Sequence, residues 1–197
     1  MATSERALQK VVLELLPPQG DWSEEDYLWL TDDTNRLIEF VDGYIEVLPM
    51  PTDEHQAISG FLCRAFSLHL QALGGIVLYA PLRIRIRARK FREPDLLVLR
   101  DAHDSRRQNR YWLGADLVVE IVSPDKPERD LVEKRMDYAL VGIPEYWIVD
   151  PRQQTITVLA LYESQYQEHG VFSRGAQATS AVLAGFSVAV DDVLDAR

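Results

Sequence analysis

The sequence predicts an α/β (α+β) fold: a mixed β-sheet with flanking helices, preceded by an N-terminal helix and β-hairpin and followed by a C-terminal β extension. The chain has 197 residues, 47% of them apolar and 26% charged, so it can bury a sizeable core and is not disordered over most of its length. Short apolar runs are interleaved with amphipathic helical patterns. One strand, helix, strand succession predicts a crossover between parallel strands.

The N-terminal part of the chain is predicted to form an arm and a capped helix. Residues 1–20 carry an apolar helical pattern that ends at two prolines, and we expect them to form an arm outside a single domain of residues 21–197. A helix is predicted to start at Ser23, whose hydroxyl and the carboxylate of Asp26 form a capping pattern. Its buried stripe is predicted to be Tyr27, Leu28 and Leu30.

A β-hairpin is predicted over Arg36 to Leu48, because Asp42-Gly43 is a strong signal for a two-residue turn. Closing the chain at this turn places Glu39 opposite Glu46. Two facing carboxylates repel each other. The pair therefore requires solvent, a cation or a neighbouring arginine.

The centre of the chain is predicted to form one helix and three strands. The helix starts at Thr52 or Asp53, either of which can cap it, and it ends near Leu73, before two glycines. Its core-facing residues are predicted to be Ile58, Phe61, Leu62, Ala65 and either Leu68 or Leu73. The strands are predicted at Ile76 to Arg87, Pro94 to Leu99 and Asp116 to Val122.

The crossover is predicted after these strands. A helix from about Glu128 to Val141 ends at Gly142, and the next strand, Glu145 to Asp150, is expected to lie parallel to an earlier strand. The C-terminal tail is predicted to hold an alternating strand from Thr155, a turn-rich stretch to Ser180 and a further strand at Val182 to Val190.

The compartment is predicted from what the chain lacks. Its single cysteine, Cys63, cannot form an internal disulfide, which fits a reducing compartment. No apolar run reaches the roughly 18 residues needed to span a membrane. The N-terminus also lacks the blocks of a secretory signal. We expect a cytoplasmic protein with no membrane partner.

The charge of the chain is unevenly distributed. The net charge is −10, which argues against a polyanionic partner. However, Arg83 to Arg110 holds ten basic and four acidic residues, a charge of +6 that leaves −16 for the rest of the chain. Such polarity favours contact with nucleic acid. Arg83, Arg85, Arg87 and Arg89 alternate with apolar residues and are expected on one strand face, about 6.6 Å apart. The alternative is a solvated strand face.

Two carboxylates stand on otherwise apolar strands. Asp95 begins one strand and Glu120 ends another, and burying either costs several kcal/mol unless it is paired or binds a metal. If the strands are antiparallel neighbours, both side chains reach one divalent cation. Oxygen ligands suit Mg²⁺ or Mn²⁺. Zinc is disfavoured, because one cysteine and four scattered histidines offer no zinc spacing. In the alternative, Asp95 caps a turn and Glu120 pairs with an arginine.

A cation is expected on the helix after Glu120. Lys134 shares its predicted core-facing side with Leu131 and Tyr138, and it is one of only four lysines. A positive charge near a metal would orient water and offset the charge that develops during phosphodiester hydrolysis. The alternative is a surface pair between Asp130 and Lys134, worth a few tenths of a kcal/mol.

Several runs carry a family resemblance. They are Glu93-Pro94-Asp95, Val118 to Pro124 and Lys134 to Pro151, supported by Glu39 to Gly43 and by Pro51 to His55. These runs resemble the Uma-two family of restriction endonuclease domains, which belongs to the PD-(D/E)XK nuclease-like superfamily. The resemblance covers roughly Trp22 to Val193.

The resemblance implies a restriction-endonuclease-like core with a defined site. In such a core Asp95, Glu120 and the Ile121 carbonyl hold the metal. The superfamily places a lysine two residues after the second acid, where this chain has Val122. The family takes its lysine from the following helix, and Lys134 matches that position.

Two further residues match polar positions of the family near the site. His55 either takes part in catalysis or forms a local hydrogen bond at the start of its helix. Glu39 either tunes the site or serves as a further carboxylate for the metal.

These observations lead to two functional hypotheses. The first is a Mg²⁺-dependent (or Mn²⁺-dependent) endonuclease that hydrolyses DNA, although the sequence does not separate DNA from RNA. A homodimer is expected, because cutting both strands of a duplex requires two sites. The second is a catalytically inactive protein of nuclease fold that acts as a nucleic-acid-binding or regulatory module. Val122 and the acidic remainder of the chain favour this second hypothesis.

Overall fold

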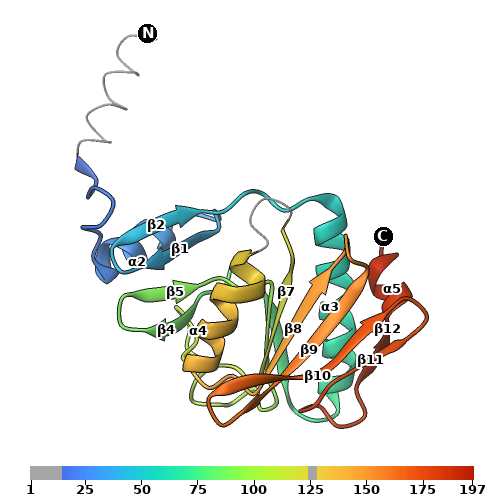
Figure 1. Ribbon diagram of the computed structural model, residues 1–197. Helices are drawn as coiled ribbons and strands as arrows, with labels where there is room; N and C mark the ends of the chain where they lie inside the picture. Colours follow the sequence, from blue (N-terminus) through green and yellow to red (C-terminus); the bar gives the residue numbers. More distant parts are fainter. Residues whose placement is uncertain (1–14, 124–127) are drawn as a thin grey trace.

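Two β-sheets form the framework of the computed structural model, which describes residues 15–123 and 128–197 (Figure 1). The larger sheet has six strands in the order β10-β9-β8-β7-β6-β3, and the smaller has four in the order β2-β1-β5-β4. The six strands are β3 (Ile76–Tyr79), β6 (Leu96–Leu99), β7 (Leu117–Ile121), β8 (Glu145–Asp150), β9 (Thr155–Tyr162) and β10 (Gln165–Ser173). The four are β1 (Ile38–Val41), β2 (Tyr44–Val47), β4 (Ile84–Arg87) and β5 (Lys90–Arg92).

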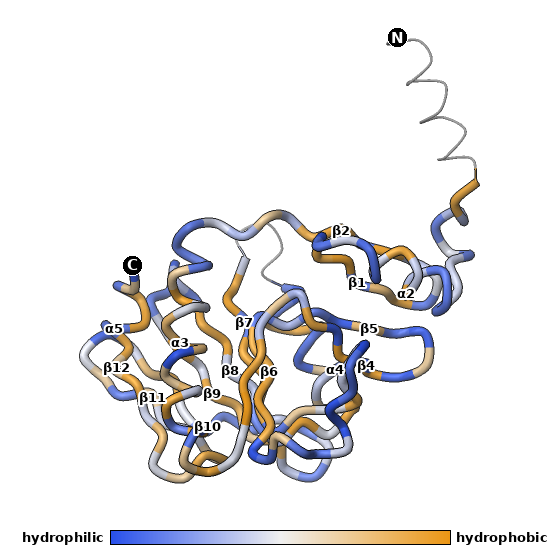
Figure 2. Tube along the Cα trace, turned by 180° about the vertical axis from the view of Figure 1, so that it is seen from behind, coloured by the Kyte–Doolittle hydropathy of each residue, from blue (hydrophilic) through white to orange (hydrophobic). Residues whose placement is uncertain are grey.

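Helices cover both faces of the larger sheet. They are α3 (Asp53–Gln71), the π-helical turn η1 (Arg129–Glu133), α4 (Lys134–Leu140) and α5 (Val190–Leu194), whereas α2 (Glu24–Asp32) packs on the smaller sheet. The helix α3 packs on one face with Leu96 and Val98, and α4 packs on the other with Leu97 and Leu99. Side chains on β6 thus alternate between two apolar layers. Accordingly β6 and β7 are orange in Figure 2, whereas the β4–β5 hairpin is largely blue.

The predicted fold class is confirmed, and so are its main local features. Ser23 caps α2 through a capping box with Asp26, and Thr52 caps α3. The hairpin has the predicted register, with Glu39 opposite Glu46. Its turn requires glycine, because Gly43 has a φ of 96° and a Cβ there would lie 2.1 Å from the Gly20 carbonyl oxygen.

The predicted sheet pairings are also confirmed. The strands β6 and β7 are antiparallel, with Leu96 opposite Val119. The strands β7 and β8 are parallel across the η1–α4 crossover. None of the helices within the described ranges is long and apolar enough to cross a membrane.

The prediction of one strand from Ile76 to Arg87 is wrong. The structure divides this segment into β3 and β4, which belong to different sheets. Pro81 lies between them, and a proline has no backbone N–H with which to continue a strand ladder. The break allows the chain to pass from the larger sheet to the smaller one.

The predicted core stripe of α3 is partly wrong. Leu68 and Leu73 are 73% and 60% exposed. The buried stripe is regularly spaced by four residues and consists of Ile58, Leu62, Phe66 and Leu70. Residues at this spacing share one face of a helix, and Leu68 lies outside it.

The C-terminal prediction needs two corrections. The stretch predicted as turns contains β10, an edge strand of the larger sheet, and most of its side chains are exposed. The predicted strand Val182 to Val190 is reduced to β12 (Ser187–Ala189), which pairs with β11 (Gln177–Thr179) in a separate two-stranded sheet. The β extension is real, but it folds beside the larger sheet.

The predicted N-terminal arm lies mostly outside the described residues, which begin at residue 15. Its described end rests on the hairpin: the side chain of Gln19 donates to the Ile45 carbonyl and accepts from the Ile45 amide, both at 2.9 Å. The boundary between an arm of residues 1–20 and a domain of residues 21–197 stays a prediction.

Candidate active site

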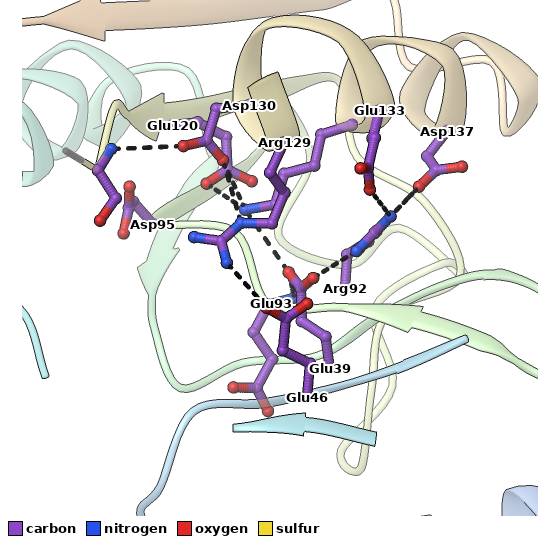
Figure 3. Close-up of polar contacts among 12 residues, drawn as sticks. Glu39, Glu46, Arg92, Glu93, Asp95, Glu120, Arg129, Asp130, Glu133 and Asp137 are labelled. Carbon is purple, nitrogen blue, oxygen red and sulfur yellow. Dashed lines mark hydrogen bonds and ion pairs between the residues drawn. The ribbon is translucent and has the colours of Figure 1, made fainter. Parts of the chain in front are cut away.

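The structure brings Asp95 and Glu120 together at neighbouring strands. Asp95 directly precedes β6 and Glu120 lies in β7, and the antiparallel register places them side by side (Figure 3). Asp95 Oδ2 accepts a hydrogen bond from the Ile121 amide at 2.7 Å. Glu120 is 2% exposed, and its Oε1 accepts from the hydroxyl of Tyr138. The carboxylates are therefore fixed by backbone and by buried side chains.

The turn η1 directs the side chain of Lys134 toward Glu120. The backbone N–H of Lys134 donates to the Arg129 carbonyl, five residues earlier, which widens the helix by one residue per turn. As a result Arg129, Asp130 and Lys134 are all buried. The predicted continuous helix from Glu128 to Val141 thus begins with a π-helical turn.

Lys134 forms the centre of a buried ionic cluster. Its Nζ lies 2.8 Å from Glu120 Oε2, 3.1 Å from Asp130 Oδ1 and 3.5 Å from Glu39 Oε1. The Asp130–Lys134 pair exists, but both side chains are at most 3% exposed, so the alternative of a surface pair is wrong. Burial alone would lower the pKa of Lys134, but the surrounding carboxylates raise it above its usual value. The lysine is permanently charged at neutral pH.

Glu39 enters this cluster from β1. Its Oε2 pairs with Arg92 Nη1 at 2.5 Å. Burial would raise the pKa of Glu39, but the charges of Lys134 and Arg92 hold it below its usual value. Across the hairpin, Glu46 Oε1 lies 3.7 Å from Arg129 Nη1. Cationic side chains thus satisfy the facing glutamates, as the sequence required.

His55 contacts the metal-binding candidate Asp95 from the first turn of α3. Its Nε2 lies 3.2 Å from Asp95 Oδ1. Burial lowers the pKa of His55, but the hydrogen bond and charge of Asp95 raise it above its usual value. Its Nδ1 is buried and has no hydrogen-bond partner within the described chain. The structure places His55 at the site, whereas its role in catalysis stays a prediction.

Sequence reasoning missed several members of the cluster. Arg92 was counted in the basic window, yet it is 3% exposed and its Nε donates to Asp137 Oδ2 at 2.8 Å. The sequence shows Asp130 only as a surface partner of Lys134, and it shows Tyr138 only as an apolar neighbour. The available signal was the spacing of Asp130, Lys134 and Tyr138, which recur every four residues on one helix face.

The cluster contains more acidic than basic side chains. Its acids are Glu39, Glu93, Asp95, Glu120 and Asp130, and its permanent cations are Arg92, Arg129 and Lys134. Burial raises the pKa of Glu120 to about 8, with repulsion from Asp130 and Asp95 adding to the effect against the attraction of Lys134. Burial likewise raises the pKa of Glu93 to about 8. At neutral pH both groups are therefore mostly protonated, so the metal-free cluster carries no excess of negative charge over its three cations.

The donor chemistry of the site fits Mg²⁺ or Mn²⁺. Asp95 and Glu120 offer oxygen atoms, which these cations prefer. Within residues 15–123 and 128–197, no group of three or more His, Cys, Asp or Glu side chains forms a complete metal site. Two carboxylates can hold Mg²⁺, because this cation keeps several of its water ligands. Val122, at the usual superfamily lysine position, is 5% exposed in an apolar cluster.

The cluster is open to solvent through a cavity of about 300 Å³. His55, Asp95, Glu120 and Lys134 line it. Further lining residues include Met50, Pro51, Ser123, Pro151 and Arg152. A small part of a substrate, such as one phosphate with its sugar, can thus reach the carboxylates.

The prediction that four arginines form one regular row on a single strand is wrong. β4 covers only Ile84–Arg87, and its pairing shifts register between Arg85 and Arg87. Arg89 lies in a turn with a φ of 61°. The side chains contact the N-terminal elements: Arg83 with Asp32 at 3.0 Å, Arg85 with Glu24 at 2.9 Å, Arg87 with Asp42 at 2.6 Å and Arg89 with the Trp22 carbonyl at 3.3 Å. Contact of these arginines with nucleic acid stays a prediction. A phosphate would have to compete with their present protein partners for the guanidinium groups.

We expect Glu93→Gln to make the metal-free protein less sensitive to alkaline pH. The folded pKa of Glu93, about 8, exceeds the value of an unfolded chain, so its contribution to stability is complete below about pH 4.5 and is lost as pH rises through 8. Glutamine stays neutral and can still accept the bond from the Ile38 amide to Glu93 Oε2.

Urea unfolding with EDTA at about pH 5 and pH 9 measures this effect. The variant should match wild type at the lower pH and exceed it by up to a few kcal/mol at the higher pH. Glu168→Gln, at an exposed position of β10, is the control. Parallel pH profiles for wild type and Glu93→Gln would contradict the expectation.

Comparisons with known proteins agree with this geometry. The family model Uma2, described as "Putative restriction endonuclease", matches residues 24–191. A solved structure described as "a putative nuclease belonging to DUF820 from Anabaena variabilis ATCC 29413" has a TM-score of 0.73 at 21% identity, over 88% of this chain and 98% of that one. This likeness shows the fold. No curated protein matches the chain. The matched region covers most of the chain and all five site residues, and the chain therefore belongs to the Uma2 family, the Uma-two family that its motifs resemble.

Proposed function

We propose that the protein is a metal-dependent endonuclease that hydrolyses phosphodiester bonds in DNA. One observation carries the proposal: Asp95 and Glu120 meet at adjacent strands on the floor of a cavity, with Lys134 Nζ 2.8 Å from Glu120. Membership in a family described as restriction endonucleases supports the same reaction class.

The carboxylates provide the metal ligands in this proposal. Asp95, Glu120 and the backbone carbonyl of Ile121 would hold Mg²⁺ or Mn²⁺. The bound cation would activate water and polarise a phosphate oxygen. A bound cation would favour the ionised form of Glu120, whose pKa of about 8 in the metal-free protein keeps it mostly protonated at neutral pH.

Lys134 acts as a fixed positive charge. Its raised pKa means that it does not accept a proton at neutral pH, so it is not a general base. Its ammonium group donates hydrogen bonds that orient the attacking water, and its charge offsets the negative charge that develops on the phosphate. These are the functions of the lysine that Val122 replaces in the superfamily pattern.

His55 and Glu39 are positioning residues in this mechanism. His55 holds one oxygen of Asp95, while the Ile121 amide holds the other. Glu39 contacts both Arg92 and Lys134, and this pairing favours a structural role over direct metal ligation. Both residues therefore act through the groups that contact the substrate.

The substrate form, assembly and compartment belong to the same proposal. Cleavage of both strands of a duplex would require a homodimer with two sites. A cytoplasmic enzyme would act on DNA in that compartment. The competing function is an inactive nucleic-acid-binding or regulatory module, which Val122 favours because β7 supplies no lysine.

Incubation with circular DNA tests the proposal, because a circle has no ends for an exonuclease. Single-stranded and double-stranded circles, together with a structured RNA, are incubated with Mg²⁺, with Mn²⁺ or with EDTA. We expect cleavage of DNA with either cation and none with EDTA. Intact circles under every condition would establish the inactive module instead.

A further inference from the structure

A second hollow continues the catalytic cavity along the outer face of α3. Its volume is about 470 Å³, and Gly60, Cys63, Arg64 and Ser67 are among its lining residues. Three further residues line both hollows: Gln56, Ser59 and Tyr79. The two hollows thus form one groove, which we call the α3 groove, leading from the acidic cluster along the helix.

Tyr79 stands at the junction of the two hollows. It ends β3, and it is paired with Leu96, the residue after Asp95. Its side chain is 63% exposed, which leaves an aromatic face free beside the catalytic carboxylates. An exposed ring next to a phosphodiesterase centre suits stacking with an unpaired base.

Each of the two hollows also contains an exposed arginine. Arg64 lines the α3 hollow and Arg152 lines the catalytic cavity, and both are exposed. Within the described residues neither guanidinium forms an ion pair, in contrast with Arg83, Arg85 and Arg87. Free guanidinium groups are available for phosphate without displacing an acid.

The depth of the catalytic groups favours a single strand. Lys134 and Glu120 are 2% exposed, so a scissile phosphate has to descend into the cavity. A strand that is unpaired can bend into the cavity and turn a base toward Tyr79, whereas stacking in a duplex keeps the bases inside.

We propose that the α3 groove binds one unpaired polynucleotide strand, with a base stacked on Tyr79 and phosphates held by Arg64 and Arg152 on either side of the scissile position. This inference rests on the proposed nuclease function and names its substrate class. A single strand needs only one catalytic site, so this substrate removes the reason for expecting a homodimer.

Fluorescence anisotropy with labelled oligonucleotides tests the inference. The probes are an oligothymidine and an oligouridine of about 20 nucleotides, longer than typical single-strand sites of roughly 4–16 nucleotides, and a duplex of the same length. Binding is measured with Ca²⁺, which occupies oxygen sites and normally does not support cleavage. We expect at least one single strand to bind more tightly than the duplex.

The variants distinguish stacking from charge. Tyr79→Ala should weaken single-strand binding roughly 5- to 150-fold, as expected for the loss of one stacked base, and Tyr79→Phe should restore it. Tyr162→Ala, at a tyrosine that is 64% exposed, is the matched control. Arg64→Gln should lower the salt dependence by about 0.7 in log–log slope, the value for one phosphate contact. Arg107→Gln, at an exposed arginine outside the groove, should leave it unchanged.

Two outcomes would overturn the inference: tighter binding of the duplex, or wild-type affinity of both Tyr79→Ala and Arg64→Gln. If the predicted binding pattern is found but circular DNA is never cut, the inference of single-strand binding in the α3 groove holds and the nuclease proposal fails. If circular DNA is cut but the variants bind as wild type, the nuclease stands and the groove fails.

Discussion

Replacing Asp95 with Asn is expected to slow DNA cleavage by at least roughly 10²- to 10³-fold, the loss typical of removing one preorganised electrostatic group from an active site. The amide oxygen can still accept the hydrogen bond from the Ile121 amide, so the local structure is kept. The negative charge that would hold the cation is lost. The substitution thus separates the chemistry of Asp95 from its structural contacts.

Initial rates on circular DNA measure this effect, and thermal unfolding verifies that the fold is intact. Asp101→Asn is the matched control, because Asp101 is exposed and also accepts a hydrogen bond from a backbone amide, that of His103. We expect the control to cleave at the wild-type rate. Equal rates for wild type and Asp95→Asn would contradict the assignment of Asp95 as a metal ligand.

Replacing Lys134 with Met is expected to abolish cleavage and to lower the free energy of unfolding by about 3–5 kcal/mol at neutral pH, the cost of removing one partner of a buried ion pair. Methionine retains much of the side-chain volume, so the loss reflects charge. Without the ammonium group, the buried carboxyl groups of Glu120 and Asp130 lose the partner that they share.

Urea unfolding with EDTA measures the change in stability, and Lys90→Met is the matched control. Lys90 Nζ pairs with Asp137 at 2.5 Å, but Asp137 retains Arg92 when Lys90 is removed. The control should therefore lose much less stability. The loss should grow as the pH rises above about 8, because Glu120 then ionises in the wild type, whereas in Lys134→Met its ionisation lacks the compensating charge of Lys134. Wild-type stability of Lys134→Met would show that the buried cluster does not depend on this charge.

The site could be predicted to the extent that local patterns determine it. An acid on an apolar strand is visible in the sequence, and the antiparallel pairing of two short buried strands is enough to bring Asp95 and Glu120 together. The hairpin register followed from Asp42-Gly43 in the same way. These inferences need only the period of a strand and the geometry of a turn.

The rest depended on contacts between residues that are distant in the sequence. Arg92 looked like one member of a basic window, but its partners Glu39 and Asp137 lie 53 and 45 residues away. In the same way, acidic residues of α2 neutralise Arg83 and Arg85. The sequence shows that α2 is acidic, but it does not show that α2 lies beside these arginines. Charge counted along the chain therefore overstated the free positive charge on this surface.

The central claim is that Asp95 and Glu120 hold one divalent cation beside Lys134, and a crystal soaked in Mn²⁺ tests it most directly. We expect one anomalous peak at a bonding distance of about 2.1 Å from an oxygen of each carboxylate, a typical length for a small divalent cation, with Lys134 nearby but not bonded to the metal. Absence of a peak at these carboxylates, with Lys134 still paired to Glu120 and Asp130, would contradict the claim and identify the cluster as a closed structural network.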